Sequence, residues 1–173
     1  MVALLYRIKQ FLNALWPSVR DSEYTWIYRE LSEAEATLFT RQTLTDQRHA
    51  LDVAYDIQNQ KRFIEMTYGS KDYQNLLHAA LLHDCGKALI ALHLWQRIFI
   101  VLFGHFPANI KKEILAQRSL LTKTLIIYQQ HPVWGKRLAF KAGVNPDIQT
   151  FILNHHAPTS PKEKILYMAD NRN

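Results

Sequence analysis

The stretch from Leu76 to Lys87, which reads LLHAALLHDCGK, constrains the fold more than any other part of the sequence. It is apolar on nearly every side over about two helical turns, and such a helix belongs in a core. Because the helix ends in His83 and Asp84, a carboxylate is expected in poorly solvated surroundings, where it needs a partner. A divalent metal ion would use the imidazole and the carboxylate at once. We expect Gly86 to end the helix in a left-handed conformation, which leaves Lys87 free to turn toward whatever the metal binds.

Further imidazoles and one carboxylate follow at intervals along the chain. They are His49 on a predicted helix, His131 in the context HPVWG, the pair His155 and His156 after an apolar run, and Asp170 near the end. Each of them alone would more often be an ordinary core or surface residue. Together they form a set of imidazole and carboxylate ligands, which suits Mn, Fe, Co, Ni or Zn better than Ca or Mg alone. His78, His93 and His105 match no such pattern, and we assign them structural or surface roles.

The order of this set, a His, then His-Asp, then a late Asp, resembles that of the HD superfamily of metal-dependent phosphohydrolases. HDCGK at residues 83–87 is similar to the HDIGK of its HDIG-type branch, and the resemblance extends from about Ala34 to Arg172. It implies an all-α, single-domain helical bundle that binds divalent metal ions. The implied ligands of one ion are His49, His83, Asp84 and Asp170. Those of a second ion are His131, His155 and His156, with Asp84 bridging the two.

The same resemblance implies a hydrolase whose catalytic residues are Asp84 and Lys87. Two ions about 3.5–4 Å apart lower the pKa of a bridging water and clamp a phosphate for in-line attack. Lys87 would neutralise a phosphate oxygen as charge develops, although it could equally be a solvated residue after a helix end. Arg172 and, more weakly, Lys136 are further candidates for phosphate contact. The expected substrate is a nucleotide or nucleotide-like phosphoester, cleaved as a phosphomonoester, a phosphodiester or a nucleotide pyrophosphate.

The branch of the family stays open. The cyclic-di-GMP phosphodiesterases of the superfamily carry Gly-Tyr-Pro after their paired histidines, whereas Ala157–Ser160 follows the pair in this chain. The tail from Lys164 to Arg172 looks like the same region of the HD-type symmetrical diadenosine tetraphosphatases. Those enzymes also have a His near the position of His131. The comparison favours a small nucleotide substrate.

Signals for helix starts recur along the chain, and no segment shows the sustained alternation of a strand. They are the capping box Ser32–Glu35, the pair Asn145–Pro146 and the capping box Ser160–Glu163. A helix from about Thr45 to Arg62 carries His49. We also expect a helix to begin at His131–Pro132, because proline at the first helical position costs no hydrogen bond. His131 would then stand at the rim of the bundle, and Gly143 would close that helix.

We divide the chain into an N-terminal amphipathic helix, residues 1–24, and one HD-type domain, residues 25–173. Apolar residues at helical spacing between Leu4 and Leu15 predict the N-terminal helix. It is shorter than the roughly 20 apolar residues that span a bilayer. A helix packed on the domain is the favoured interpretation, and a helix lying in a membrane interface is the alternative.

The most apolar part of the chain runs from Ala88 to Phe106, with Arg97 near its middle. It is barely long enough to span a membrane, so a buried helix or an oligomer contact, such as that of a homodimer, is favoured. This segment also supports a different class of function. The protein could be a non-catalytic, metal-stabilised sensor or interaction module that uses residues 88–106 to bind a partner or a membrane.

The net charge of +6 and the pI near 9.5 favour anionic ligands such as nucleotides, nucleic acid or a membrane surface. The basic residues form no run of five or more, so a dedicated nucleic-acid-binding arm is not expected. A single cysteine, Cys85, excludes a disulfide within the chain, and we interpret it as a small buried apolar residue. Nothing in the composition suggests an oxidising compartment, so a cytoplasmic location is expected.

Overall fold

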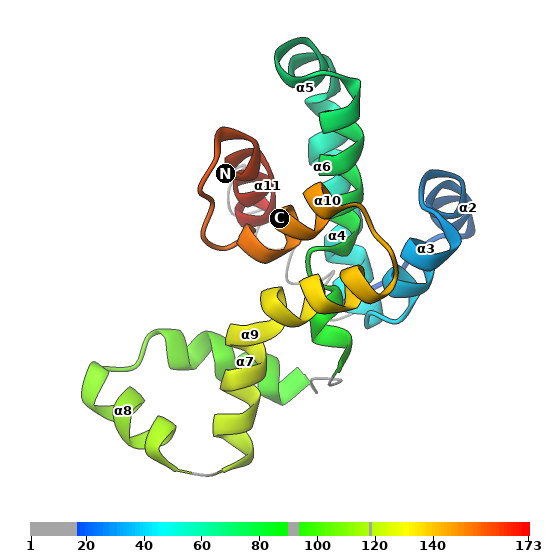
Figure 1. Ribbon diagram of the computed structural model, residues 1–173. Helices are drawn as coiled ribbons and strands as arrows, with labels where there is room; N and C mark the ends of the chain where they lie inside the picture. The colour runs from blue at the N-terminus through cyan, green and yellow to red at the C-terminus, as the bar shows by residue number, and fades with distance from the viewer. Residues whose placement is uncertain (1–16, 90–93, 118) are drawn as a thin grey trace, which may run out of the picture.

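The computed structural model describes residues 17–89, 94–117 and 119–173, and all the regular structure in these residues is helical (Figure 1). The helices, in chain order, are α2 (Asp21–Glu30), α3 (Glu33–Thr40), α4 (Leu44–Asn59), α5 (Lys61–Tyr68), α6 (Ser70–Leu82), the 3₁₀ helix η1 (Cys85–Leu89), α7 (Leu94–Gly104), α8 (Ala108–Ala116), α9 (Leu120–Lys141), α10 (Pro146–Asn154) and α11 (Pro161–Arg172). These described residues include no strand, which confirms the expected all-α fold of a single helical domain.

Helix α6 lies at the centre of the domain and is buried on nearly every side. Leu76, Leu81 and Leu82 are fully buried, and α6 packs against α3, α4, α5, α10 and α11 (Figure 1). The prediction that this apolar stretch forms a core helix is therefore confirmed. Because α6 ends at Leu82, His83 and Asp84 follow directly, and both are buried.

The three predicted helix starts are confirmed, with Ser32, Asn145 and Ser160 as the caps of α3, α10 and α11. The backbone amide of Ser32 donates to the Glu35 carboxylate at 3.0 Å, while the Ser32 hydroxyl accepts from the Glu35 amide at 3.4 Å. The same reciprocal pair joins Ser160 to Glu163. Such caps satisfy amides that have no partner inside the helix. They also determine where the ligand candidates fall along α10 and α11.

The helix that carries His49 is shorter than predicted, because α4 ends at Asn59 instead of near Arg62. At Gln60 the backbone has φ −95° and ψ 5°, and the Gln60 carbonyl accepts from the Ile64 amide at 3.0 Å. A new helix, α5, starts there. Glutamine and its neighbours are ordinary helix formers, so no local signal marks this break.

The predicted helix start at His131–Pro132 is wrong, since Pro132 lies inside the 22-residue helix α9. Proline has no backbone N–H, so the carbonyl four residues earlier, that of Tyr128, loses its usual partner. The imidazole Nδ1 of His131 contacts this carbonyl and replaces the missing donor. As a result His131 is fully buried instead of standing at the rim of the bundle.

Gly86 does not adopt the expected left-handed conformation. Among the described glycines, only Gly69 and Gly143 have positive φ, and Gly143 follows the end of α9 as predicted. A Cβ atom on Gly86 would instead overlap the carbonyl oxygen of His131 and lie 2.6 Å from the amide nitrogen of Gly135. Glycine is needed here because η1 and α9 touch through their backbones. This close approach brings His83 and Asp84 next to α9.

The predicted N-terminal helix lies mostly outside the described residues, which begin at residue 17. Tyr24, the last residue of the predicted N-terminal segment, lies inside helix α2. Its phenol donates a hydrogen bond to the side-chain oxygen of Gln47 at 2.7 Å. Helix α2 itself was not predicted. Its buried residue Ile27 joins the main core.

The apolar segment 88–106 is divided between η1, which ends at Leu89, and α7, with residues 90–93 outside the described part of the chain. Ile100 and Phe103 of α7 pack with Leu125 of α9 in a small second cluster, whereas Leu102 is half-exposed. Helices α7 and α8 pack on α9 at one end of the domain (Figure 1). Over the residues that the structure describes, no helix has the length and apolar character needed to cross a membrane.

Candidate metal centre

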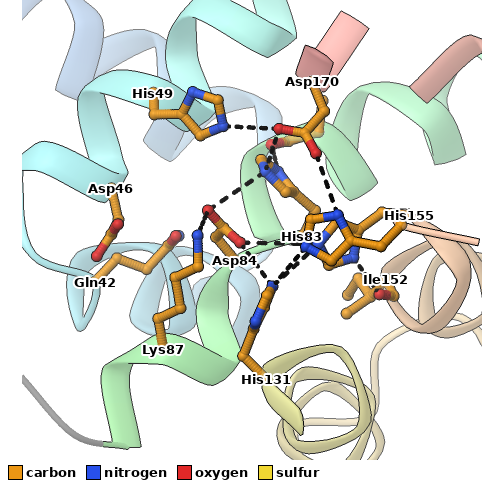
Figure 2. A network of polar contacts seen from close by, with 12 residues as sticks. Gln42, Asp46, His49, His83, Asp84, Lys87, His131, Ile152, His155 and Asp170 are labelled. Carbon is orange, nitrogen blue, oxygen red and sulfur yellow. Dashed lines mark hydrogen bonds and ion pairs between the residues drawn. The ribbon is translucent and has the colours of Figure 1, made fainter. Parts of the chain in front are cut away.

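All seven predicted metal ligands converge on one place in the domain (Figure 2). His49 comes from α4, and His83 and Asp84 follow the C-terminus of α6. The others come from α9, from the end of α10 and from α11, and they are His131, His155, His156 and Asp170. Segments that are up to 121 positions apart in sequence therefore supply one cluster. We call these seven side chains the His/Asp cluster.

One part of the His/Asp cluster contains His49, His83 and Asp84, whose ligand atoms all lie within 4.8 Å of one another. Asp170 adjoins this group, with its Oδ1 atom 2.9 Å from Nε2 of His49 and 3.6 Å from Nε2 of His83. Nε2 of His83 also lies 3.6 Å from Oδ2 of Asp84. The group could hold a metal ion.

The other part contains His131, His155 and His156, whose ligand atoms also lie within 4.8 Å of one another. Nε2 of His131 is 3.2 Å from Nε2 of His155 and 3.2 Å from Nε2 of His156. This group could also hold a metal ion. Asp84 lies between the two groups, because its Oδ1 is 3.2 Å from Nε2 of His131 while its Oδ2 faces His83.

The three fully buried imidazoles share one orientation. Nδ1 of His83 donates to the Ala80 carbonyl at 2.8 Å, and Nδ1 of His155 donates to the Ile152 carbonyl at 2.7 Å. His131 makes the equivalent contact three residues back. A carbonyl oxygen only accepts, so Nδ1 carries a proton, and each ring presents the Nε2 lone pair when it is neutral. Two lone pairs 3.2 Å apart cannot hydrogen-bond to each other, whereas a cation between them would bind both.

Two buried polar atoms in the His/Asp cluster have no hydrogen-bond partner, Nε2 of His83 and Oδ1 of Asp84. Buried polar atoms are rarely left unpaired, because an unmade hydrogen bond costs about 1–3 kcal/mol. Both atoms belong to the adjacent residues His83 and Asp84, which the sequence analysis predicted as metal ligands. The donor set of imidazole nitrogens and carboxylate oxygens fits a divalent first-row metal ion.

The charges of Asp84 and His155 agree with this interpretation, whereas His83 has to lose a proton before it can bind a metal ion. Burial lowers the pKa of His83, but the carboxylates of Asp84 and Asp170 outweigh it and raise this pKa to about 9. Burial also raises the pKa of Asp84, yet Lys87 and His83 outweigh it and hold this pKa well below its usual range. Burial together with the charge of His83 lowers the pKa of His155 to about 2. At neutral pH the carboxylate is charged and His155 is neutral, as metal ligands are.

Lys87 is not a solvated surface residue, since its side chain is only 16% exposed. Its ammonium lies 2.5 Å from Oδ2 of Asp84 and 5.8 Å from the ring centre of Tyr128. Burial lowers the pKa of Lys87, but the carboxylates of Asp84 and Asp46 outweigh it and raise it. Lys87 therefore carries its positive charge at the edge of the His/Asp cluster (Figure 2).

The two weaker phosphate-binding candidates are not part of the cluster. The guanidinium of Arg172 pairs with Asp56, with Nη2 2.7 Å from Oδ2, although Arg172 is only two residues beyond Asp170. Lys136 is five positions after His131, which places it on a different face of α9.

Gln42 and Asp46 lie beside Lys87, and the sequence interpretation missed both (Figure 2). The Gln42 amide donates to the Leu81 carbonyl at 3.0 Å, while its buried Oε1 atom has no hydrogen-bond partner. Asp46 accepts from the Thr43 hydroxyl at 2.6 Å. The only available signal was that Asp46 precedes His49 by three positions, which puts both on one face of α4.

Comparison with protein-family models, with curated proteins and with solved structures gives no match for this chain. The functional interpretation therefore depends on the geometry of the His/Asp cluster.

Proposed function

We propose that the protein is a metal-dependent phosphohydrolase of the HD type that hydrolyses a nucleotide or nucleotide-like phosphoester. In this proposal His49, His83, Asp84 and Asp170 bind one divalent ion, and His131, His155 and His156 bind a second with Asp84 as the shared ligand. The observation that carries the proposal is the convergence of buried imidazoles whose Nε2 lone pairs face one another around a carboxylate oxygen without a hydrogen-bond partner.

When bound, two divalent ions supply an activated water and a clamp on the phosphate. The chain itself supplies the orientation of each ligand, because backbone carbonyls hold the Nδ1 atoms of the three buried imidazoles. It also supplies Lys87, whose ammonium neutralises charge that develops on a phosphate oxygen.

The cluster has one accessible edge. His156 is 46% exposed and His49 is 27% exposed, whereas His83, His131 and His155 are fully buried. A phosphate can therefore reach the cluster from the side of His49 and His156. The positive net charge of the protein favours an anionic substrate.

A non-catalytic, metal-stabilised module is the competing function. A structural metal site is usually closed by four ligands. Seven ligand candidates, an exposed edge and an adjacent buried ammonium exceed that need, which supports the catalytic interpretation.

The test is elemental analysis of the purified protein, followed by assays with a panel of nucleotides and a generic phosphodiester in the presence of Mn, Fe or Co. We expect bound divalent metal and turnover of at least one nucleotide. Bound metal without turnover of any substrate would favour the non-catalytic module, and the absence of metal binding would contradict both.

A further inference from the structure

The positive charge of the protein is concentrated in one part of the chain. Residues 85–146 contain nine of the 21 basic residues but only one of the 15 acidic ones. This third of the chain therefore carries a net charge of +8, and the remainder carries −2. Helix α9 lies in this part, and its 22 residues include four basic side chains and no Asp or Glu. A surface of this kind attracts polyanions.

Helix α9 exposes a continuous face along most of its length. Its members are spaced alternately three and four positions apart, as residues on one side of a helix are. They are Lys123, Ile126, Gln130, Val133, Arg137 and Phe140, and all six are exposed. We call them the outer face of α9. The face extends for about 26 Å, at 1.5 Å per residue.

The outer face combines cations with large apolar side chains. Ile126 is 42% exposed, Val133 is 41% exposed and Phe140 is 71% exposed. Phe140 has Lys141 beside it and Arg137 one turn before it, so the most exposed apolar ring of the face lies among cations.

This face is turned away from the His/Asp cluster. His131, Gly135 and Ala139 form the buried side of α9, which packs on η1 and α10. At 100° per residue, the outer face is centred about half a turn from them. Helices α7 and α8 also pack on α9, toward its N-terminal half (Figure 1). The outer face is therefore independent of the proposed catalytic site.

We propose that the outer face of α9 docks the protein on an anionic membrane surface. A helix that binds in a membrane interface places apolar side chains at the boundary of headgroups and acyl chains while its Lys and Arg side chains bind anionic headgroups. The outer face has both components. A second copy of the chain fits less well, because pairing two such faces would bring cations together with no acid on α9 to neutralise them. A nucleic-acid backbone would use the cations but not the exposed Ile, Val and Phe side chains.

The test is co-sedimentation of the full chain with vesicles of phosphatidylcholine that contain about one-third phosphatidylglycerol, and with vesicles of phosphatidylcholine alone. We expect binding to the anionic vesicles only, weakened by added salt. The double variant Lys123→Gln/Arg137→Gln should lower the partition coefficient about 30-fold, since each cation near an anionic surface contributes about fivefold. The triple variant Ile126→Ser/Val133→Ser/Phe140→Ser should lower it at least about tenfold.

Two control variants change the same kinds of residue elsewhere. Lys71→Gln/Lys164→Gln removes two exposed cations, and Phe63→Ser/Met66→Ser removes two exposed apolar side chains of α5. Both should bind the vesicles as the wild type does, and circular dichroism should show equal helicity in all variants. Equal losses in the control and outer-face variants would overturn the proposal.

Other outcomes would also overturn it. Vesicle binding that is unchanged in both outer-face variants would assign binding to another part of the chain. Absence of vesicle binding, with a change of oligomeric state in the outer-face variants by light scattering, would identify this face as a contact between copies. None of these outcomes depends on hydrolase activity.

Discussion

Glu23 and Asp84 are both buried carboxylates, yet their oxygen atoms have different partners. Glu23 accepts from the guanidinium of Arg48 at 2.8 Å, from the phenol of Tyr55 at 3.0 Å and from the backbone amide of Arg20 at 2.8 Å. Asp84 pairs with a lysine through one oxygen, while its other oxygen has no hydrogen-bond partner. Both carboxylate oxygens of Glu23 accept hydrogen bonds from protein donors, whereas only one oxygen of Asp84 has a hydrogen-bond partner in the protein.

The same contrast separates two histidines that lie close together in the sequence. His78 has Nδ1 3.0 Å from the Glu35 carboxylate, and its side chain is 18% exposed, so the ring also keeps contact with solvent. His83 is fully buried and binds a backbone carbonyl through Nδ1, but its Nε2, 3.6 Å from the carboxylates of Asp84 and Asp170, has no hydrogen-bond partner. A polar group whose partners are all protein atoms stabilises the fold. At His83 and Asp84 the unpartnered atoms belong to adjacent residues within a group of further imidazoles, and this combination favours a bound cation, because leaving both atoms unpaired is costly.

The largest expected effect comes from removing the shared carboxylate of the His/Asp cluster. Asp84→Ala should abolish both metal loading and turnover, since one oxygen of Asp84 faces His131 and the other faces His83, one in each part of the cluster. Elemental analysis and a hydrolysis assay measure the two effects. Asp72→Ala is the matched control, because Asp72 pairs with Lys162 at 3.0 Å, in a contact that does not involve the cluster. Normal activity in Asp84→Ala would reject the assignment.

Lys87 tests whether the cluster is catalytic or only binds metal. Lys87→Ala should retain the metal and slow hydrolysis by about 10²–10³-fold, the usual cost of removing one group that stabilises developing charge. Steady-state kinetics measures the loss, and Lys71→Ala serves as the surface control. If Lys87→Ala hydrolyses substrate at the wild-type rate, the lysine has no role in the chemistry.

A substitution of Glu23 should affect the stability of the fold and leave metal binding unchanged. Glu23→Gln should lower the free energy of unfolding by about 1–3 kcal/mol, because the partly buried Arg48 and Tyr55 lose a charged acceptor. Urea denaturation measures this change. Metal content should be the same as in the wild type. A loss of metal in this variant would show that the two carboxylates are not functionally distinct.

A variant of His131 tests whether the two parts of the His/Asp cluster each bind a metal ion. His131→Ala should remove one of two ions, because its Nε2 atom faces only His155, His156 and one oxygen of Asp84. The metal-to-protein ratio should fall to half of its wild-type value in elemental analysis. An unchanged ratio would argue for a single ion held by the other group.

The smallest expected effect is on how the free energy of unfolding depends on pH under acidic conditions. Burial raises the pKa of Glu23, but hydrogen bonds from Arg20, Arg48 and Tyr55 outweigh it and lower the pKa from 4.5 to about 2. A lowered folded-state pKa contributes stability above about pH 4.5 that is lost as the pH falls toward 2. Between pH 5 and pH 3 the wild type should lose about 2 kcal/mol more than Glu23→Gln does. Equal slopes for the two proteins in denaturation at several pH values would contradict this prediction.

Local sequence signals predicted much of the helical framework. Capping boxes at Ser32 and Ser160, and the Asn145–Pro146 pair, mark helix starts through contacts between residues three positions apart or fewer. The apolar run before His83 predicted the core helix because a helix without a polar face has to be buried. These signals depend on neighbours in the chain, so the sequence contains all the information they need.

The failures share a different cause. Pro132 is compatible with a helix start and with a helix interior, and the choice depended on a long helix whose freed carbonyl His131 contacts. Gly86 looked like a left-handed helix end, but the constraint on it is the backbone of α9, about 50 positions away. The break at Gln60 had no clear local signal, and the neighbours of Lys87 had only the spacing between Asp46 and His49. Each of these features depends on which segments pack together.

The sequence by itself determined the all-α fold class, the principal helix caps and the identity of the seven residues that meet in the cluster. Only the tertiary structure decided that these residues meet, that Lys87 is paired with Asp84, and that one face of α9 is buried while the other is exposed. The physical reason is that capping and amphipathicity are short-range properties of the chain. Burial, the pairing of charges and the convergence of ligands depend on contacts between distant segments, which exist only after the helices have packed.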